Sequence, residues 1–140
     1  MKTVKASDIT NLVEKLCIDA CCDISDDINN KFKSCLETEK SPLGKNVLRT
    51  LIENAKIARD ERSPMCQDTG VTVVFVKMGQ NVKIEGGFIE DAINQGVRQG
   101  YEKGYLRKSV VRSPIDRVNT GDNTPAVIHY EIVLEDVFHI

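Results

Sequence analysis

The hydrophobic pattern of this chain changes its period near residue 62, and this change limits the folds open to it. Before that point, apolar residues recur every three or four positions, which is typical of amphipathic helices. After it, residues 71–76 form a β-branched apolar run that is typical of a buried strand. The pattern predicts one α+β domain over residues 1–140, helical over 1–62 and β/α over 63–140. We expect its N-terminal helices to pack with a small mixed, mostly antiparallel sheet and a following helix.

Three helices are expected in the first sixty residues. Ser7 is a candidate N-cap for the first helix, and Ser25 precedes two acidic residues that suit the start of the second. Ser41-Pro42 marks the start of the third, because proline is tolerated at the first helical position. All three segments carry an apolar stripe, so we expect each to bury one face.

The second part of the chain predicts a strand over 71–76, a short return strand over 82–84, a helix over 88–104 and a strand over 126–135. The predicted helix carries a glycine every four residues, although each glycine costs a helix up to ~1 kcal/mol relative to alanine. Such a row indicates that a neighbouring backbone packs closely against Gly96, Gly100 and Gly104.

Composition excludes several classes of protein. The 140 residues are 41% hydrophobic and 29% charged with a net charge of −2, which suits a globular domain and argues against nucleic-acid or membrane-surface partners. No apolar run approaches the roughly 18 residues of a membrane span, and the N-terminus lacks the apolar core of a signal peptide. We therefore expect a cytoplasmic protein.

The five cysteines do not form a zinc or disulfide pattern. Their number is odd and no C-x-x-C pair occurs. Cys17, Cys21 and Cys35 fall on the apolar stripes, where free cysteine acts as a small hydrophobic residue. A metal pair at Cys17 and Cys21 is the alternative, but no histidine or carboxylate shares that stripe. Cys22 lies off the stripe, and Cys66 lies in a turn.

That turn, Cys66-Gln67-Asp68-Thr69-Gly70, gathers a thiol, an amide, a carboxylate and a hydroxyl between a predicted helix and strand. Cysteine thiolates are the usual ligands of iron–sulfur clusters, and a carboxylate such as Asp68 can transfer protons. The arginines of a later basic stretch, Arg107 and Arg112, could clamp a small di-acid. The alternatives are a structural cysteine beside a polar turn, a reactive thiol at Cys66, and arginines on a solvated face.

Several segments, taken in order, give a more specific indication. The chain resembles the N-terminal portion of the alpha subunit of the class I iron–sulfur fumarate hydratase and L-tartrate dehydratase family, over about the first half of that subunit. The resemblance is carried by Pro64-Met65-Cys66-Gln67-Asp68-Thr69-Gly70, Glu85-Gly86-Gly87, Leu106-Arg107-Lys108-Ser109, Ser113-Pro114-Ile115-Asp116 and Asn119-Thr120-Gly121-Asp122-Asn123-Thr124-Pro125-Ala126.

The resemblance implies a reaction and a set of residue roles. In that family a [4Fe-4S] cluster held by three cysteines acts as a Lewis acid in the reversible hydration of fumarate to S-malate. By resemblance, Cys66 is one cluster ligand, Gln67 and Asp68 contact the dicarboxylate substrate, and Arg107 binds a substrate carboxylate. Asp68 is the candidate for proton transfer. The implied partners are the remainder of the alpha subunit and a beta subunit or domain.

The chain departs from the family pattern in its cysteines. The four other cysteines all precede Cys66, whereas the two remaining family ligands follow the matched region. We therefore expect this chain alone to hold no stable cluster and to be inactive. L-tartrate as substrate and a non-catalytic assembly module are the alternatives. Apolar surface left exposed would also allow a homo-oligomer.

Overall fold

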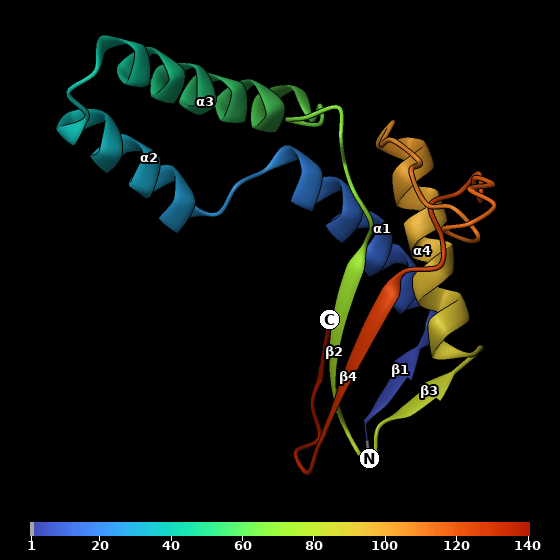
Figure 1. Cartoon of the computed structure of the whole chain (residues 1–140). Helices are drawn as coiled ribbons and strands as arrows, with labels where there is room; N and C mark the ends of the chain where they lie inside the picture. Colours follow the sequence, from blue (N-terminus) through green and yellow to red (C-terminus); the bar gives the residue numbers. More distant parts are fainter. Residues whose placement is uncertain (1) are drawn as a thin grey trace.

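The computed structural model describes residues 2–140, and in the second part of the chain a helix lies between two pairs of strands in sequence (Figure 1). In chain order the elements are β1 (Thr3–Lys5), α1 (Ala6–Cys22), α2 (Asp26–Thr38), α3 (Pro42–Glu61), β2 (Val73–Gly79), β3 (Lys83–Glu85), α4 (Ile89–Lys103), β4 (Val127–Val133) and β5 (Phe138–His139). Within this described range, no helix combines the length and the apolar character needed to cross a membrane.

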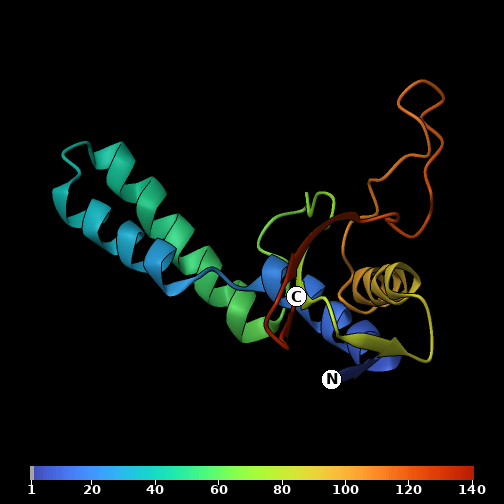
Figure 2. The same ribbon diagram turned by 90° about the horizontal axis from the view of Figure 1, so that it is seen from below.

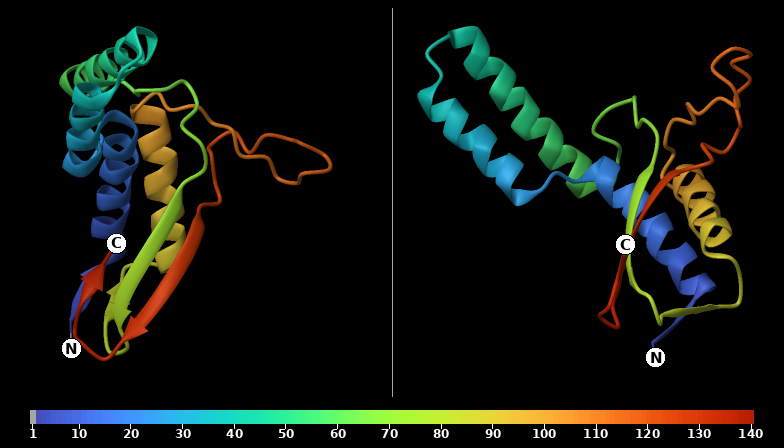
Figure 3. Two further views of the ribbon diagram at one scale, coloured as in Figure 1. Left: turned by 60° about the vertical axis from the view of Figure 1, so that its left-hand side comes forward. Right: turned by 60° about the horizontal axis from the view of Figure 1, so that its bottom comes forward.

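Helices α1 and α4 lie side by side and cover one face of the β2–β4 sheet (Figures 1 and 3). The apolar stripe of each helix meets the alternate side chains of β2 that point inward, in one cluster. Its members buried most deeply are Ile9, Val13, Val76, Ile93 and Val97. The predicted helix over 88–104 is confirmed, with Phe88 and Gly104 as its caps.

The glycine row of α4 is the contact surface for α1. A Cβ on Gly96 would lie 2.6 Å from the carbonyl oxygen of Thr10, and one on Gly100 would lie 2.8 Å from the Cβ of Cys17. Both separations are shorter than carbon atoms tolerate, so only glycine permits this spacing of the two helices. The predicted close approach of a neighbouring backbone is confirmed.

The sheet is mixed, as predicted, but its pairing is mainly parallel. Its strand order is β4-β2-β5, with β2 parallel to β4 along seven residue pairs and antiparallel to β5 only at Lys77 and Met78. The expected antiparallel majority is therefore wrong, because α4 crosses between β2 and β4 and returns the chain in the same direction. The predicted return strand pairs with β1 in parallel, from Thr3↔Lys83 to Lys5↔Glu85, and not with β2.

Helices α2 and α3 form a hairpin that projects away from the sheet (Figures 1 and 2). No residue of α2 is buried, and in α3 only Ala58 is. The expectation that all three N-terminal helices bury an apolar face on the sheet is therefore confirmed only for α1. The apolar stripes of the hairpin leave Ile28, Leu43, Val47, Leu51 and Ile57 exposed.

Two of the three predicted helix caps are at the right residues. Ser25 and Ser41 are the N-caps of α2 and α3, and the Ser41 hydroxyl accepts a hydrogen bond from the Gly44 N–H at 3.4 Å. The Ser7 cap is wrong, because α1 already begins at Ala6 with Lys5 as its N-cap. Strand β1 runs directly into this helix and leaves no separate capping turn.

The five cysteines are all free thiols, but their burial differs from the prediction. Cys17 is buried as expected, whereas Cys21 and Cys35 are half-buried, because the hairpin covers little. Cys22 is completely buried although it lies off the stripe. It sits at the end of α1, where Arg62 pairs with Asp19. Burial raises the pKa of the Cys22 thiol, and the positive charge of Arg62 lowers it in part.

Candidate functional site

The turn that contains Cys66 follows α3 and is held to two helices. The chain leaves α3 at Arg62, whose backbone is left-handed with φ of 53°. The N–H of Met65 donates to the carbonyl of Cys21 at 2.9 Å, and the side-chain amide of Asn54 donates to the carbonyl of Met65 at 2.8 Å. The start of the turn is thus fixed against both α1 and α3.

The other end of the turn is fixed by α4. The Tyr101 hydroxyl lies 3.1 Å from the carbonyl oxygen of Thr69 and 3.2 Å from that of Gly70, within donating distance of both. Gly70 has φ of 64°, a conformation that glycine adopts without strain. Its N–H donates to Oδ1 of Asp68 at 3.2 Å, which closes a local turn.

The basic stretch (107–114) and the polar loop (119–126) follow α4 in the sequence and lie close to this turn. The hydroxyl of Thr69 donates to the carbonyl of Arg107 at 3.2 Å. Residues 107–126 then form a long loop that extends away from the body and returns to β4 (Figures 2 and 3). A single antiparallel bridge between Val111 and Asn119 joins its two arms.

Asn123 joins the three motifs. Its side chain is fully buried, and its Oδ1 accepts from the N–H groups of Ser109 at 2.7 Å and Val110 at 3.0 Å. Its Nδ2 donates to the carbonyl of Gly70 at 3.1 Å. Sequence reasoning did not single out Asn123. The signal was present, because an asparagine in a turn-rich loop can satisfy several backbone groups and tolerates positive φ, which is 62° here.

Asp122 anchors the same loop to α4. Its Oδ2 accepts from Arg98 at 2.8 Å, and its Oδ1 accepts from the hydroxyl and the N–H of Thr124 at 2.7 and 3.0 Å. Partial burial by itself would raise the pKa of this carboxyl. The hydrogen bonds from Thr124 and the charge of Arg98 outweigh it and lower the pKa from 3.8 to about 2.

These anchors produce an open depression of about 380 Å³. It is lined by Pro64, Cys66, Gln67, Thr69, Tyr105 and Arg107. The structure therefore brings together three of the four predicted site residues, Cys66, Gln67 and Arg107, all of them exposed. Asp68 is also exposed but does not line the depression, because its carboxylate turns to the N–H of Gly70. Tyr105, which is 92% exposed, is a lining residue that the sequence did not indicate.

The guanidinium of Arg107 is available for a ligand. Arg59, Arg62 and Arg98 each form an ion pair with an aspartate. Arg107 has no ion-pair partner among residues 2–140 and lies at the wall of the depression. An unpaired arginine beside a side-chain amide can bind a carboxylate in bidentate fashion. Arg112 does not line the depression, so the predicted clamp retains one arginine.

The residues of this chain do not by themselves fit a cluster that needs three thiolates. Cys66 is the cysteine at the depression, whereas the other four lie on α1 and α2. Across residues 2–140, no group of three or more His, Cys, Asp or Glu side chains is arranged to hold a metal ion. The depression offers one thiol and one cation.

Comparison with known proteins identifies the family of this chain. Residues 10–140 match the family model described as fumarate hydratase. A Methanocaldococcus jannaschii protein provisionally named L(+)-tartrate dehydratase subunit alpha is 36% identical over 124 residues, covering 85% of this chain and 43% of the relative. The L(+)-tartrate dehydratase subunit alpha of Escherichia coli K12 is 36% identical over 99 residues, covering 71% and 32% respectively. The chain thus spans less than half the length of these curated relatives, and it belongs to the fumarate hydratase family.

Proposed function

We propose that this chain supplies the N-terminal part of a hydro-lyase alpha subunit that reversibly hydrates fumarate to S-malate. One observation carries the proposal: Cys66 and Gln67 of one motif and Arg107 of another line one depression. The family match over residues 10–140 supports the reaction class. Hydration breaks the carbon–carbon π bond and forms one C–O and one C–H bond, so the enzyme must hold two carboxylates and move a proton.

The chain's own residues suit the binding and proton-transfer parts of this task. Arg107 would bind one substrate carboxylate, since its guanidinium has no protein partner in the described range. Gln67 would donate to or accept from the substrate at the same wall. Asp68 would transfer the proton at the substrate hydroxyl, through the carboxylate oxygen that does not accept from Gly70.

Cys66 is proposed as one thiolate ligand of a [4Fe-4S] cluster whose other ligands lie outside this chain. When bound, such a cluster supplies a Lewis acid for the substrate oxygens. The remainder of the alpha subunit and a beta subunit are the proposed partners, because the curated relatives are alpha subunits more than twice as long as the matched region. A cytoplasmic location is part of the proposal, and five free cysteines support it because they suit a reducing compartment.

L-tartrate is the second candidate substrate. The relatives at 36% identity carry the name L(+)-tartrate dehydratase, whereas the family model carries the name fumarate hydratase. The two substrates are both four-carbon di-acids, so Arg107 serves either one equally well. Assays should therefore use fumarate and L-tartrate in parallel.

The test is reconstitution with the missing parts. The chain is combined, under anaerobic conditions with iron and sulfide, with the rest of the alpha subunit and the beta subunit of the Escherichia coli relative. We expect hydro-lyase activity that Cys66→Ser abolishes and that Arg107→Lys weakens by raising KM, because lysine cannot form the bidentate pair. Binding of the partners without any activity would instead identify a non-catalytic assembly module.

A further inference from the structure

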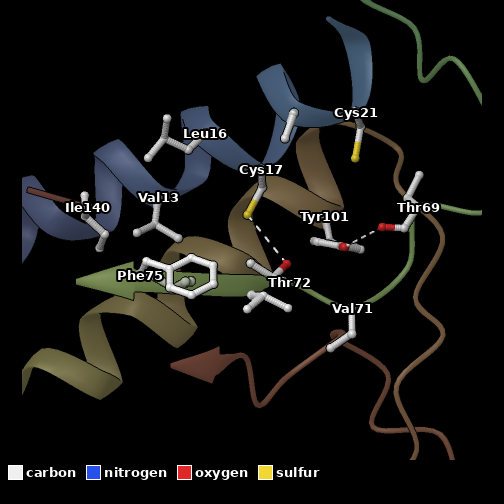
Figure 4. A pocket seen from close by; sticks show the side chains of 13 residues that line it. Val13, Leu16, Cys17, Cys21, Thr69, Val71, Thr72, Phe75, Tyr101 and Ile140 are labelled. Atoms are coloured by element: carbon white, nitrogen blue, oxygen red, sulfur yellow. Dashed lines mark hydrogen bonds between the residues drawn. The ribbon is translucent and has the colours of Figure 1, made fainter. Parts of the chain in front are cut away.

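A second cavity, larger than the candidate site, lies between α1 and β2 (Figure 4). Its volume is about 430 Å³, and most of its lining is apolar, including Val13, Leu16, Val74 and Ile140. The proposed hydration has no use for an apolar cavity. Thr69 lines both this cavity and the depression, so the two meet at the Cys66 turn.

The cavity opens along an edge of β2 that is only partly paired. Successive residues of a strand direct their backbone groups to opposite edges. The carbonyl of Thr72 accepts from Val127 of β4, and the N–H of Gly79 donates to Val137 beside β5. Even-numbered residues of β2 therefore face β4, and odd-numbered ones face β5. Within residues 2–140, β5 pairs with β2 only at Lys77 and Met78.

The backbone groups of Val73 and Phe75 consequently point to the β5 edge without a strand beside them. Val73 is 47% exposed and Phe75 is 69% exposed, and an exposed unpaired edge of this kind is a template for a further strand. The register of β5 defines how such a strand would run. Lys77 faces His139 and Met78 faces Phe138, so Ile140 lies opposite Val76, and a strand in line with β5 would pass Phe75 and then Val73. It would end beside the Cys66 turn.

We propose that this edge and cavity are the docking site of one extended segment from the remainder of the alpha subunit, the partner named under the proposed function. The segment runs antiparallel to β2, in the register of β5, with apolar side chains at alternate positions. Residues paired directly across a sheet share one face. The segment's residue opposite Val74 would therefore point into the cavity, as Val74 and Ile140 do, and so would the residue opposite Thr72. The longer relatives have the chain length to supply such a segment, since this chain spans 43% and 32% of two of them.

The docked segment would add backbone hydrogen bonds along β2 and would fill the apolar cavity, which is the recognition mode called β-strand addition. It would also fix the residues that follow it next to Thr69 and the depression. Docking of this segment would therefore also affect the position of Thr69, which lines both the cavity and the depression. This inference concerns assembly and does not depend on which di-acid the enzyme uses.

The experiment extends the full chain at Ile140 by four residues and follows amide hydrogen exchange. In the first variant, Thr-Val-Thr-Val is appended, which places both valines on the cavity side. The matched control appends Val-Thr-Val-Thr, which has the same composition but turns the valines outward. Exchange at Val74 and Val76, whose amides face β4, serves as the internal reference.

We expect the amides of Val73 and Phe75 to exchange fast in the unextended chain and at least about tenfold more slowly in the first variant, with a smaller change in the control. Unchanged exchange in the first variant, or equal protection by both extensions, would overturn the proposal. Slow exchange in the unextended chain, together with a dimer in sedimentation, would show that a second copy occupies the edge and would also overturn it. Enzyme activity enters none of these outcomes, so they are independent of the proposed function.

Discussion

The side chain of Asn123 accepts two hydrogen bonds from the adjacent N–H groups of Ser109 and Val110 and donates one to the carbonyl of Gly70 in the Cys66 turn. Replacement by alanine leaves two N–H groups and one carbonyl without this partner. We expect Asn123→Ala to lower the free energy of unfolding by about 2–3 kcal/mol, as for other buried polar groups left unpaired. Urea unfolding measures the change.

Asn123→Gly separates the two contributions of this residue. Glycine keeps the positive φ of 62° without strain but makes none of the side-chain hydrogen bonds. We expect a loss only slightly smaller than for alanine. If Asn123→Ala and the wild type had the same urea midpoint of unfolding, the three loops would hold together without this side chain.

The lowered pKa of Asp122 makes the free energy of unfolding depend on pH in a defined way. Its pKa is about 2 in the folded chain and 3.8 as the ordinary value, so the unfolded chain takes up this proton first as the pH falls. Its contribution to stability is therefore present above about pH 4 and is lost between pH 4 and 2. We expect Asp122→Asn to be less stable at neutral pH and to show a flatter loss over that interval. Equal slopes in acid urea titrations of both proteins would contradict this.

The sequence indicated the chemical residues of the site better than their supports. Cys66, Gln67 and Arg107 were singled out by residue type and by motif, and the structure places them around one depression. Asn123 and Tyr105 were missed, because a support or a lining residue is defined by which loops meet at it. That information depends on contacts between residues far apart in the chain, and hydrophobic periodicity does not contain it.

At the level of elements, the α1–α4 contact depends on glycine. A Cβ at Gly96 would meet the backbone oxygen of Thr10 at 2.6 Å, and backbone cannot move aside as a side chain can. We expect Gly96→Ala to destabilise the fold by roughly 1–3 kcal/mol through overpacking, although alanine favours an isolated helix by up to ~1 kcal/mol. Thermal and urea unfolding both report the change.

Gly44→Ala is the matched control for this prediction. Gly44 also lies in a helix, but its added Cβ would meet the flexible end of the Glu39 side chain at 2.8 Å. We expect a change within about 0.5 kcal/mol, since the side chain can move aside. Equal effects of the two substitutions would show that the close packing of α1 on α4 is not what requires Gly96.

Strand direction was the part of the fold that periodicity could not provide. Residues 71–76 and 126–135 were both predicted as strands, and the helix between them was predicted as well. A strand, a crossover helix and a strand are compatible with parallel pairing, yet the short segment at 82–84 suggested a hairpin instead. It pairs with β1, which precedes α1 and was not predicted. Three residues are too few to show a strand period.

At the level of the whole molecule, the hairpin of α2 and α3 and the open edge of β2 are unfinished surfaces. The hairpin leaves Leu43 74% exposed and Val47 52% exposed, and the apolar cavity lies beside Val73 and Phe75. Monomeric proteins rarely leave this much apolar surface uncovered, so both surfaces suit a chain that joins further parts. The cysteines led to a related expectation from the sequence, that further parts are needed, because Cys66 alone could not hold the cluster that the resemblance implies.

The measurement closest to the central claim is anaerobic reconstitution of the chain alone. Purified chain is incubated with ferrous iron, sulfide and reductant and then desalted, and iron and sulfide per chain are determined beside a fumarate hydration assay. Because Cys66 is the one cysteine at the depression, we predict far less than a full cluster per chain, no malate formation, and no difference between the wild type and Cys66→Ser. Near four irons per chain, together with malate formation that Cys66→Ser abolishes, would contradict the account.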